Sequence, residues 1–357
     1  MAGIGFELRK IYGRKTLASN IWGSVYATMA SVGSSALVAV LFLFLKFMMD
    51  RSNVTELESR FFVSSFTYVF LASILISAFF QTTLSRYISD CVFQKAEEDI
   101  CAAVFGVLAV GSVISGVLML FLCAGMYEKS EISVSFLALY YCLGVLVTNA
   151  YNLMTFVSAL KEYKEVTLSY FLGIVLAGAV FLAASQMFGV HIVTSAYLAL
   201  VCGYFLLNLF LVFWCVKAFG RPGKHCFAFL NYFAAYPKLT ASGFCYMLGF
   251  YISTAVYWFF SDMKEQVSIF RTAPTYDLAM FFAIIVNMSA LVIFVVKVET
   301  AFFDKYVAYL SALNHGSYER IEKERETMNH VIRYQLFFVY EVQLTGITGV
   351  WYCSLIR

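Results

Sequence analysis

Nine charged or amide side chains lie within long apolar stretches of the sequence. A carboxylate, an ammonium group or an amide is costly to place in a membrane, so it usually faces a partner or a water-filled cavity. Such groups could hydrogen-bond a polar substrate, hold an ion or pass a proton. The candidates within these stretches for lining or gating a transport pathway are Gln81, Arg86, Asn149, Asn152, Asn208, Lys238, Asn287, Glu341 and Gln343.

Glu341 and Lys238 are the deepest charged candidates. Glu341 lies about eight residues, or roughly 12 Å along a helix, into the last apolar stretch. Lys238 follows Pro237 at a similar depth in the stretch 230–260. The long aliphatic stem of a lysine also lets its ammonium group reach the nearest interface, so an interfacial position for Lys238 stays open.

Further charges bracket an uncharged run of 19 residues, Leu278–Val296. Asp277 precedes the run, and Lys297 and Glu299 follow it. Asp277 and Lys297 would be about 30 Å apart in a helix, which is the thickness of the hydrocarbon core, so they cannot pair with each other. Pro274 and Asp277 are typical of a helix start. These charges are therefore expected to mark the polar ends of a spanning helix, while Asp277 and Glu299 also stay candidates for lining or gating the transport pathway.

The sequence lacks the usual catalytic motifs. It contains no D-x-D element, no G-x-x-x-x-G-K-[ST] phosphate loop and no H-E-x-x-H metal site. His315 and Glu319 form an H-x-x-x-E pair, which we interpret as part of a polar linker. The nine cysteines include no C-x-x-C pair, and most lie in apolar runs as small buried side chains. We therefore expect a transporter or scaffold rather than an enzyme, without a cofactor or a metal.

The elements that must position these side chains are membrane helices. The chain of 357 residues is 61% hydrophobic and 13% charged, whereas soluble domains average about 45–50% apolar and about 25% charged residues. Its long runs are continuously apolar rather than alternating, which favours spanning helices and excludes a membrane β-barrel. The sequence thus predicts an all-α polytopic membrane protein. About nine spanning segments are expected, near 18–45, 61–85, 101–126, 132–158, 166–187, 192–216, 230–260, 277–297 and 334–356.

The basic residues of the connections predict the orientation of the chain. With the N-terminus inside, seventeen Lys and Arg residues fall on the cytoplasmic side and seven on the other, as the positive-inside rule favours. Residues 1–17 would then lie in the cytoplasmic interface as a basic, partly amphipathic segment. The charged connection 300–333 is expected to extend the eighth helix into the cytoplasm.

The first apolar segment carries small residues at four-residue spacing. In a membrane, small side chains let a second helix approach closely. The spacing predicts either a tight packing face or a helix that slides against its neighbours during transport. This helix-packing ladder consists of Gly23, Ala27, Ser31, Ser35 and Ala39.

Three sequence elements resemble the Pel exopolysaccharide transporter family. They are MAGIGFELRK at the N-terminus, PTYDLAMFFAIIVN at 274–287 and VVKVETAFFDKYVAY at 295–309. The resemblance implies a MATE-like flippase fold in the inner (cytoplasmic) membrane, with two six-helix lobes around a cleft. It implies export of an amino-sugar polymer for the biofilm matrix. Because Glu299 falls in a family element, the resemblance also favours a specific partner for its carboxylate.

The resemblance implies partners as well. These are the polysaccharide substrate, membrane lipid, a cytoplasmic glycosyltransferase and other membrane subunits of a synthase complex that responds to cyclic-di-GMP. Nucleic acid is not among them.

The resemblance further divides the chain. Residues 18–216 would form the first six-helix lobe, 217–229 the cytoplasmic linker between the lobes, and 230–357 an incomplete second lobe of three helices. Family members have about twelve spanning segments against about nine here. The chain is therefore expected to be a C-terminally truncated copy, or to rely on another subunit for the missing wall.

Two other functions stay open at this point. The chain could be a non-transporting membrane anchor that docks the glycosyltransferase through residues 300–333. It could also be a MATE-like drug or ion antiporter, for which Glu341 would supply the intramembrane carboxylate.

Overall fold

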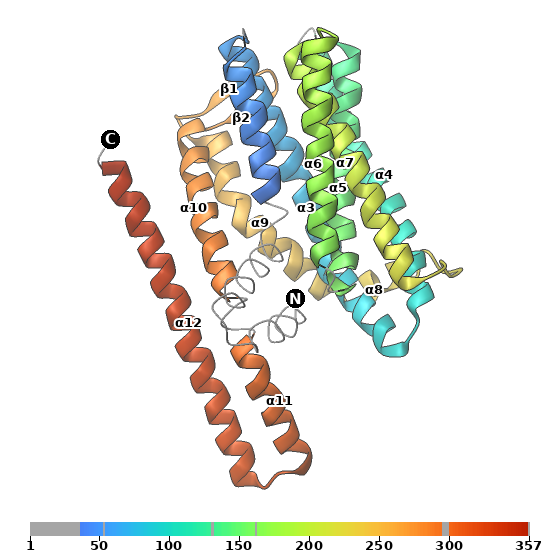
Figure 1. Cartoon of the computed structure of the whole chain (residues 1–357), viewed down its shortest axis with the longest axis vertical. Coiled ribbons are helices and arrows are strands. Elements are labelled where there is room, and N and C mark those ends of the chain that lie inside the picture. Colours follow the sequence, from blue (N-terminus) through green and yellow to red (C-terminus); the bar gives the residue numbers. More distant parts are fainter. Residues whose placement is uncertain (1–35, 53, 130–131, 161–162, 295–299, 356–357) are drawn as a thin grey trace. The chain divides into compact units, whose positions relative to one another are not determined.

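The structure, a computed structural model, describes residues 36–52, 54–129, 132–160, 163–294 and 300–355. Within these ranges the regular secondary structure is helical apart from one two-stranded hairpin (Figure 1). The predicted fold class, an all-α polytopic membrane protein, is confirmed. The chain divides into two units, 36–276 and, among the described residues that remain, 277–355; each is treated by itself below.

Six helices of the described chain are long and apolar enough to cross a membrane. The five predicted segments between 61 and 216 each correspond to one of them. Residues 36–50, the described end of the first predicted segment, are also helical. The total of about nine segments stays a prediction. The six helices are α3 (Glu56–Gln94), α4 (Glu97–Lys129), α5 (Val134–Leu160), α6 (Tyr163–Leu182) with its π-helical end Ala183–Met187, α7 (Ile192–Phe219) and α9 (Pro237–Phe260).

Local signals explain where α3 begins and ends. The Thr55 hydroxyl accepts a hydrogen bond from the Glu58 backbone N–H (3.3 Å), and the Glu58 carboxylate accepts one from the Thr55 N–H (2.9 Å). This capping box satisfies backbone donors that the first turn leaves free. At the other end Lys95 adopts a left-handed conformation with φ 58°, which terminates the helix. An acidic first turn then starts α4, as suits the helix dipole.

The core of the unit 36–276 lies where α3 and α7 pack on α5, while α4 packs on α5 and α6 packs on α7. Aromatic side chains fill it: Phe62, Tyr140, Phe156 and Tyr197 are fully buried. The Ser65 and Tyr197 hydroxyls hydrogen-bond each other across α3 and α7 (2.6 Å). A hydroxyl buried in this way needs such a partner, because no water in the hydrocarbon layer can replace it.

The prediction of one continuous spanning segment over 230–260 is wrong. The structure has a short helix α8 (Leu230–Ala235), a break at Tyr236, and then α9. Pro237 occupies the first turn of α9, where its missing N–H costs no hydrogen bond, and its ring disfavours a helical conformation for the residue before it. The break therefore follows from one proline.

A β-hairpin follows α9 and was not expected from the sequence. Strands β1 (Glu265–Val267) and β2 (Phe270–Thr272) pair antiparallel, with Gln266 opposite Arg271. Phe270 is fully buried and its ring lies 4.9 Å from that of Tyr68 on α3. The Tyr68 hydroxyl donates to the Arg271 carbonyl (2.8 Å) and accepts from the Arg271 N–H (3.2 Å). The hairpin is thus held on α3 by both packing and hydrogen bonds.

The remaining helices are α10 (Pro274–Ile293), α11 (Thr300–His315) and α12 (Tyr318–Leu355). Helices α11 and α12 lie side by side as a helical hairpin (Figure 1). The prediction that 300–333 extends one helix is wrong, because α11 ends at His315, before Gly316. The charged residues after it begin α12, which continues without a break through the last predicted span.

Candidate functional site

Asn149 and Asn152, both predicted from the sequence, lie together on the face of α5 that packs against α4. The Asn149 side-chain N–H donates to the Ser112 hydroxyl (2.8 Å). Asn152 is 2% exposed, and neither its amide N–H nor its amide oxygen finds a hydrogen-bond partner among the described residues. The Asn149 oxygen is likewise unpaired there. Gly111 makes room for both amides, since a Cβ at that position would lie 2.8 Å from the Asn152 nitrogen and 3.2 Å from the Asn149 oxygen.

The buried amide of Asn208 on α7 has a different role. Its N–H group donates to the Leu146 carbonyl of α5 (3.0 Å) and to the Tyr204 carbonyl of its own helix (2.8 Å). The bond to Leu146 joins α7 to α5 inside the bundle. Asn208 is therefore best explained as a packing residue, in contrast to Asn152.

Arg86 and Lys238 lie at the end of α3 where α9 begins. The Arg86 guanidinium donates to the Asp90 carboxylate (3.2 Å) and sits 5.8 Å from the centre of the Tyr236 ring. Lys238 is exposed in the first turn of α9. The sequence predicts that Lys238 lies deep inside one continuous helix. That prediction is wrong, because the break at Tyr236 places Lys238 at the start of α9. Gln81 is exposed on α3, about one turn before Arg86.

Hydrogen bonds hold this junction together. The Thr82 hydroxyl of α3 donates to the Leu239 carbonyl (3.2 Å), and the Thr83 and Thr240 hydroxyls hydrogen-bond each other (2.7 Å). The exposed Gln81, Arg86, Tyr236 and Lys238 are consequently presented on a rigid frame. Amide, guanidinium, phenol and ammonium groups of this kind can donate hydrogen bonds to a polyhydroxylated substrate.

In the unit 277–355, Asp277 and Glu341 occupy different environments. Asp277 lies in the first turn of α10, which confirms the helix start predicted at Pro274. Glu341 is exposed on α12. Two residues later, the Gln343 amide donates to the Asn287 side-chain oxygen of α10 (3.2 Å). The polar contact between α10 and α12 thus involves Gln343 rather than Glu341.

Several predicted residues fall outside the described part of the chain. These are Glu299 and four members of the small-residue ladder, Gly23, Ala27, Ser31 and Ser35. The fifth member, Ala39, is half-buried in the helix 36–50. Within the described ranges, no group of three or more His, Cys, Asp or Glu side chains is arranged to hold a metal ion.

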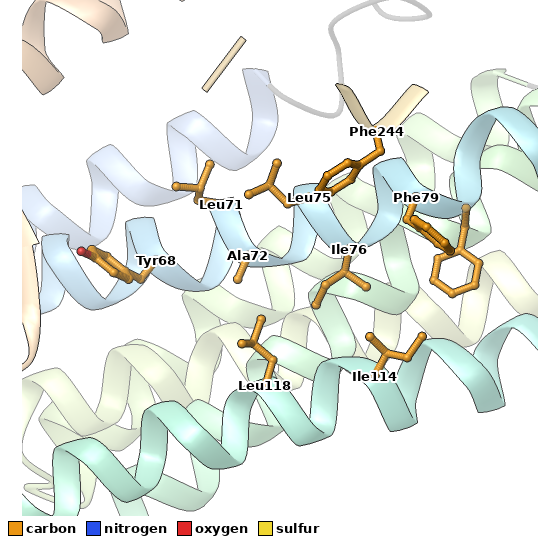
Figure 2. Close-up of a pocket in the computed structure, with 10 residues that line it drawn as sticks. Tyr68, Leu71, Ala72, Leu75, Ile76, Phe79, Ile114, Leu118 and Phe244 are labelled. Carbon is orange, nitrogen blue, oxygen red and sulfur yellow. The ribbon is translucent and has the colours of Figure 1, made fainter. Parts of the chain in front are cut away.

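The sequence did not reveal an apolar groove of about 400 Å³ along α3 (Figure 2). Its floor runs from Tyr68 to Phe80, and Ile114 and Leu118 of α4 form one wall. Phe244 of α9 closes the other side. Each lining residue looks like an ordinary lipid-facing or core side chain in the sequence, so no motif could mark the groove.

Comparison with known proteins gives a match to a protein family. No curated protein and no solved structure was found to match the chain. A family model described as "PelG: Putative exopolysaccharide Exporter (EPS-E)" matches residues 1–356, which is nearly the whole sequence. Together with the six apolar helices, this match identifies the chain as a multi-pass membrane protein that belongs to the PelG family of exopolysaccharide exporters.

Proposed function

We propose that the chain moves an amino-sugar exopolysaccharide of the Pel type across the cytoplasmic membrane, with its N-terminus in the cytoplasm. The observation that carries this proposal is the family match over residues 1–356. The multi-pass helical architecture supports it, because a polymer with many hydroxyl groups cannot cross hydrocarbon unless a protein supplies polar partners. The finer points, namely the amino sugar and the inner membrane, rest on the sequence resemblance.

We place the first contact with the polymer at the junction of α3 and α9. Gln81 and Arg86 lie exposed near the end of α3, and Tyr236 and Lys238 lie exposed at the start of α9. The orientation predicted from basic residues puts this end in the cytoplasm, where a polymer leaves its synthase. A tyrosine ring offers a sugar an apolar face, and the neighbouring donors bind its hydroxyl and amide oxygens.

Complementation in the host tests this function. The gene is deleted, the chain or a variant is restored, and extracellular amino-sugar polymer is quantified. We expect the intact chain to restore polymer, and Tyr236→Ala and Lys238→Gln to lower its amount. Arg51→Gln, which changes an exposed arginine at the opposite end of the unit, is the matched control. Full export by both junction variants at normal membrane levels would contradict the placement, and no export by the intact chain would contradict the function.

The alternative of a membrane anchor has one observation in its favour. The α11–α12 hairpin carries a run of exposed or half-exposed charges, Arg320 to Glu326, which could dock a cytoplasmic glycosyltransferase. Charge reversal of this run separates the two functions. Loss of synthase recruitment with the transport geometry intact would favour the anchor, whereas unchanged recruitment with lowered export would favour the transporter. The antiporter alternative stays a prediction, to be tested by dye efflux with Glu341→Gln.

A further inference from the structure

The groove on α3 is chemically unsuited to a sugar polymer. Its described lining consists of aliphatic and aromatic side chains, from Leu71 and Leu75 on the floor to Phe244 on α9 (Figure 2). The Tyr68 hydroxyl, the one polar group at its rim among these residues, is already engaged by the Arg271 backbone. A sugar hydroxyl moved there from water would lose its hydrogen bonds without replacement. A hydrocarbon chain makes no hydrogen bonds to water, so it would lose none on entering the groove.

The dimensions of the groove suit an extended hydrocarbon chain. The floor from Tyr68 to Phe80 covers twelve helical steps, or about 18 Å. A volume of about 400 Å³ over that length leaves a cross-section of roughly 22 Å² or more. A single methylene chain, whose carbons contact neighbours at about 4 Å, needs roughly 16 Å². The groove is therefore long enough and wide enough for one extended acyl chain.

A cation lies where the head of such a lipid would be. Arg271 is fixed at the Tyr68 end of the groove by the two backbone hydrogen bonds to the Tyr68 hydroxyl, and its exposed guanidinium lies 5.6 Å from the centre of the Phe259 ring. Arginine binds phosphate through paired N–H donors. The groove itself lies in the uncharged part of α3 between Arg60 and Arg86, at the depth of lipid tails.

We infer that this groove binds one acyl chain of an anionic phospholipid of the surrounding bilayer, with the lipid phosphate at Arg271. The bound chain fills the space between α4 and α9 and so links these helices to α3. The inference concerns lipid binding by the purified protein and does not depend on the identity of the exported polymer.

Trp258 provides a local reporter for the test. It is 2% exposed and stacks on the Tyr68 ring at 4.7 Å between centroids, so bulk lipid has little access to it. The protein is prepared with Trp22, Trp214 and Trp351 replaced by Phe, and is reconstituted with phosphatidylglycerol brominated on its acyl chain. We expect the bromine to quench the fluorescence of Trp258. No quenching in this background would overturn the inference and mean that the groove is closed to lipid.

Filling the groove should abolish the quenching. Ala72→Phe on the floor and, as a second variant on the α4 wall, Leu118→Phe place bulk where the chain would lie. Ala109→Phe adds the same side chain at an exposed position of α4 outside the groove and should quench like the parent. Quenching that persists in Ala72→Phe, or that is lost equally in Ala109→Phe, would overturn the inference.

The head group is tested with lipids of different charge. The parent protein should be quenched more by brominated phosphatidylglycerol than by brominated phosphatidylcholine at equal mole fraction. Arg271→Gln should remove that preference, whereas Arg51→Gln, which alters another exposed arginine, should retain it. A preference that survives in Arg271→Gln would overturn the assignment of the phosphate to Arg271.

Discussion

Asn149 and Asn152 lie three positions apart on α5, but their amides differ in hydrogen bonding. Asn149 donates to Ser112, whereas both polar atoms of Asn152 are buried without a partner among the described residues. A buried polar group left unsatisfied costs about 1–3 kcal/mol. Such a group is rare in native proteins and points to a functional reason for its retention. We infer that Asn152 serves transport rather than stability.

Replacing each asparagine by leucine tests this difference. Asn152→Leu should raise the free energy of unfolding by about 1 kcal/mol or more, because it removes an unsatisfied group. Asn149→Leu should lower it by about 0.6 kcal/mol, the average for a hydrogen bond between membrane helices. Thermal unfolding in detergent measures both. A less stable Asn152→Leu protein would show that the amide is satisfied after all, and lowered polymer export by a stable one would support the transport role.

At the scale of elements, the contact between α6 and α7 depends on two glycines. A Cβ on Gly203 would lie 2.7 Å from the Gly173 carbonyl oxygen, and a Cβ on Gly173 would lie 2.9 Å from that of Gly203. The two backbones therefore touch, which small residues allow in membrane bundles. Gly178, further along α6, has open space beside it.

Alanine substitutions should separate these positions. Gly203→Ala pushes against a carbonyl that cannot yield without a helix shift, so it should lower the free energy of unfolding by about 1–3 kcal/mol. Gly178→Ala adds a methyl group in open space and should be neutral or stabilising by about 0.5–1 kcal/mol, since alanine is the better helix former. Unfolding in detergent compares the two. Equal effects would mean that α6 and α7 do not touch at Gly203.

The β-hairpin is held mainly by the burial of Phe270. Phe270→Ala should lower the free energy of unfolding by about 3–5 kcal/mol, the usual cost of emptying a buried aromatic site. Arg60→Gln breaks the ion pair with Glu265 (2.7 Å), whose side chains are 50% and 43% exposed. It should cost at most about 1 kcal/mol, because solvent screens such pairs. If Arg60→Gln lowered the free energy of unfolding more than Phe270→Ala in the same assay, the ion pair rather than the burial of Phe270 would be what holds the hairpin.

At the scale of the molecule, the hairpin and residues 220–229, the part of the predicted linker 217–229 that follows α7, lie at opposite ends of α3. The hairpin contacts Tyr68 and Arg60 toward the start of α3. The linker lies beyond its other end, where the Gly223 N–H donates to the Glu98 carbonyl (2.9 Å). A helix of 39 residues is about 58 Å long, more than the thickness of a bilayer. The two segments are therefore expected on opposite sides of the membrane.

Cysteine accessibility tests this topology and the predicted orientation together. In a protein with its nine cysteines replaced, Met263→Cys beside the hairpin should react with a membrane-impermeant maleimide in intact cells. Lys224→Cys in the linker should react only after permeabilisation. The opposite result would reverse the orientation, and labelling of both sites in intact cells would contradict the placement of α3 across the bilayer.

Much of this architecture could be predicted because a membrane restricts the choices of the backbone. Uncharged runs such as Val134–Leu160 have to satisfy their N–H and carbonyl groups internally, and a helix is the local way to do so. Composition and basic residues were therefore enough for the fold class and for most helix positions. Asp277 at the start of α10 also followed from local rules, since a proline and an acidic residue suit a first turn.

Contacts between distant residues could not be foreseen in this way. Whether Asn149 reaches Ser112, and whether Asn152 is left without a partner, depends on how α5 is rotated against α4, which packing sets. The sequence predicts Lys238 deep in a helix because the residues on both sides of Tyr236 are largely apolar. The helix break at Tyr236 is therefore hidden in the sequence pattern. The hairpin is stable because Tyr68 and Phe270, some 200 positions apart in the sequence, come together. The groove exists because α4 and α9 leave a space between them beside α3, and that space is a property of their packing rather than of any one segment.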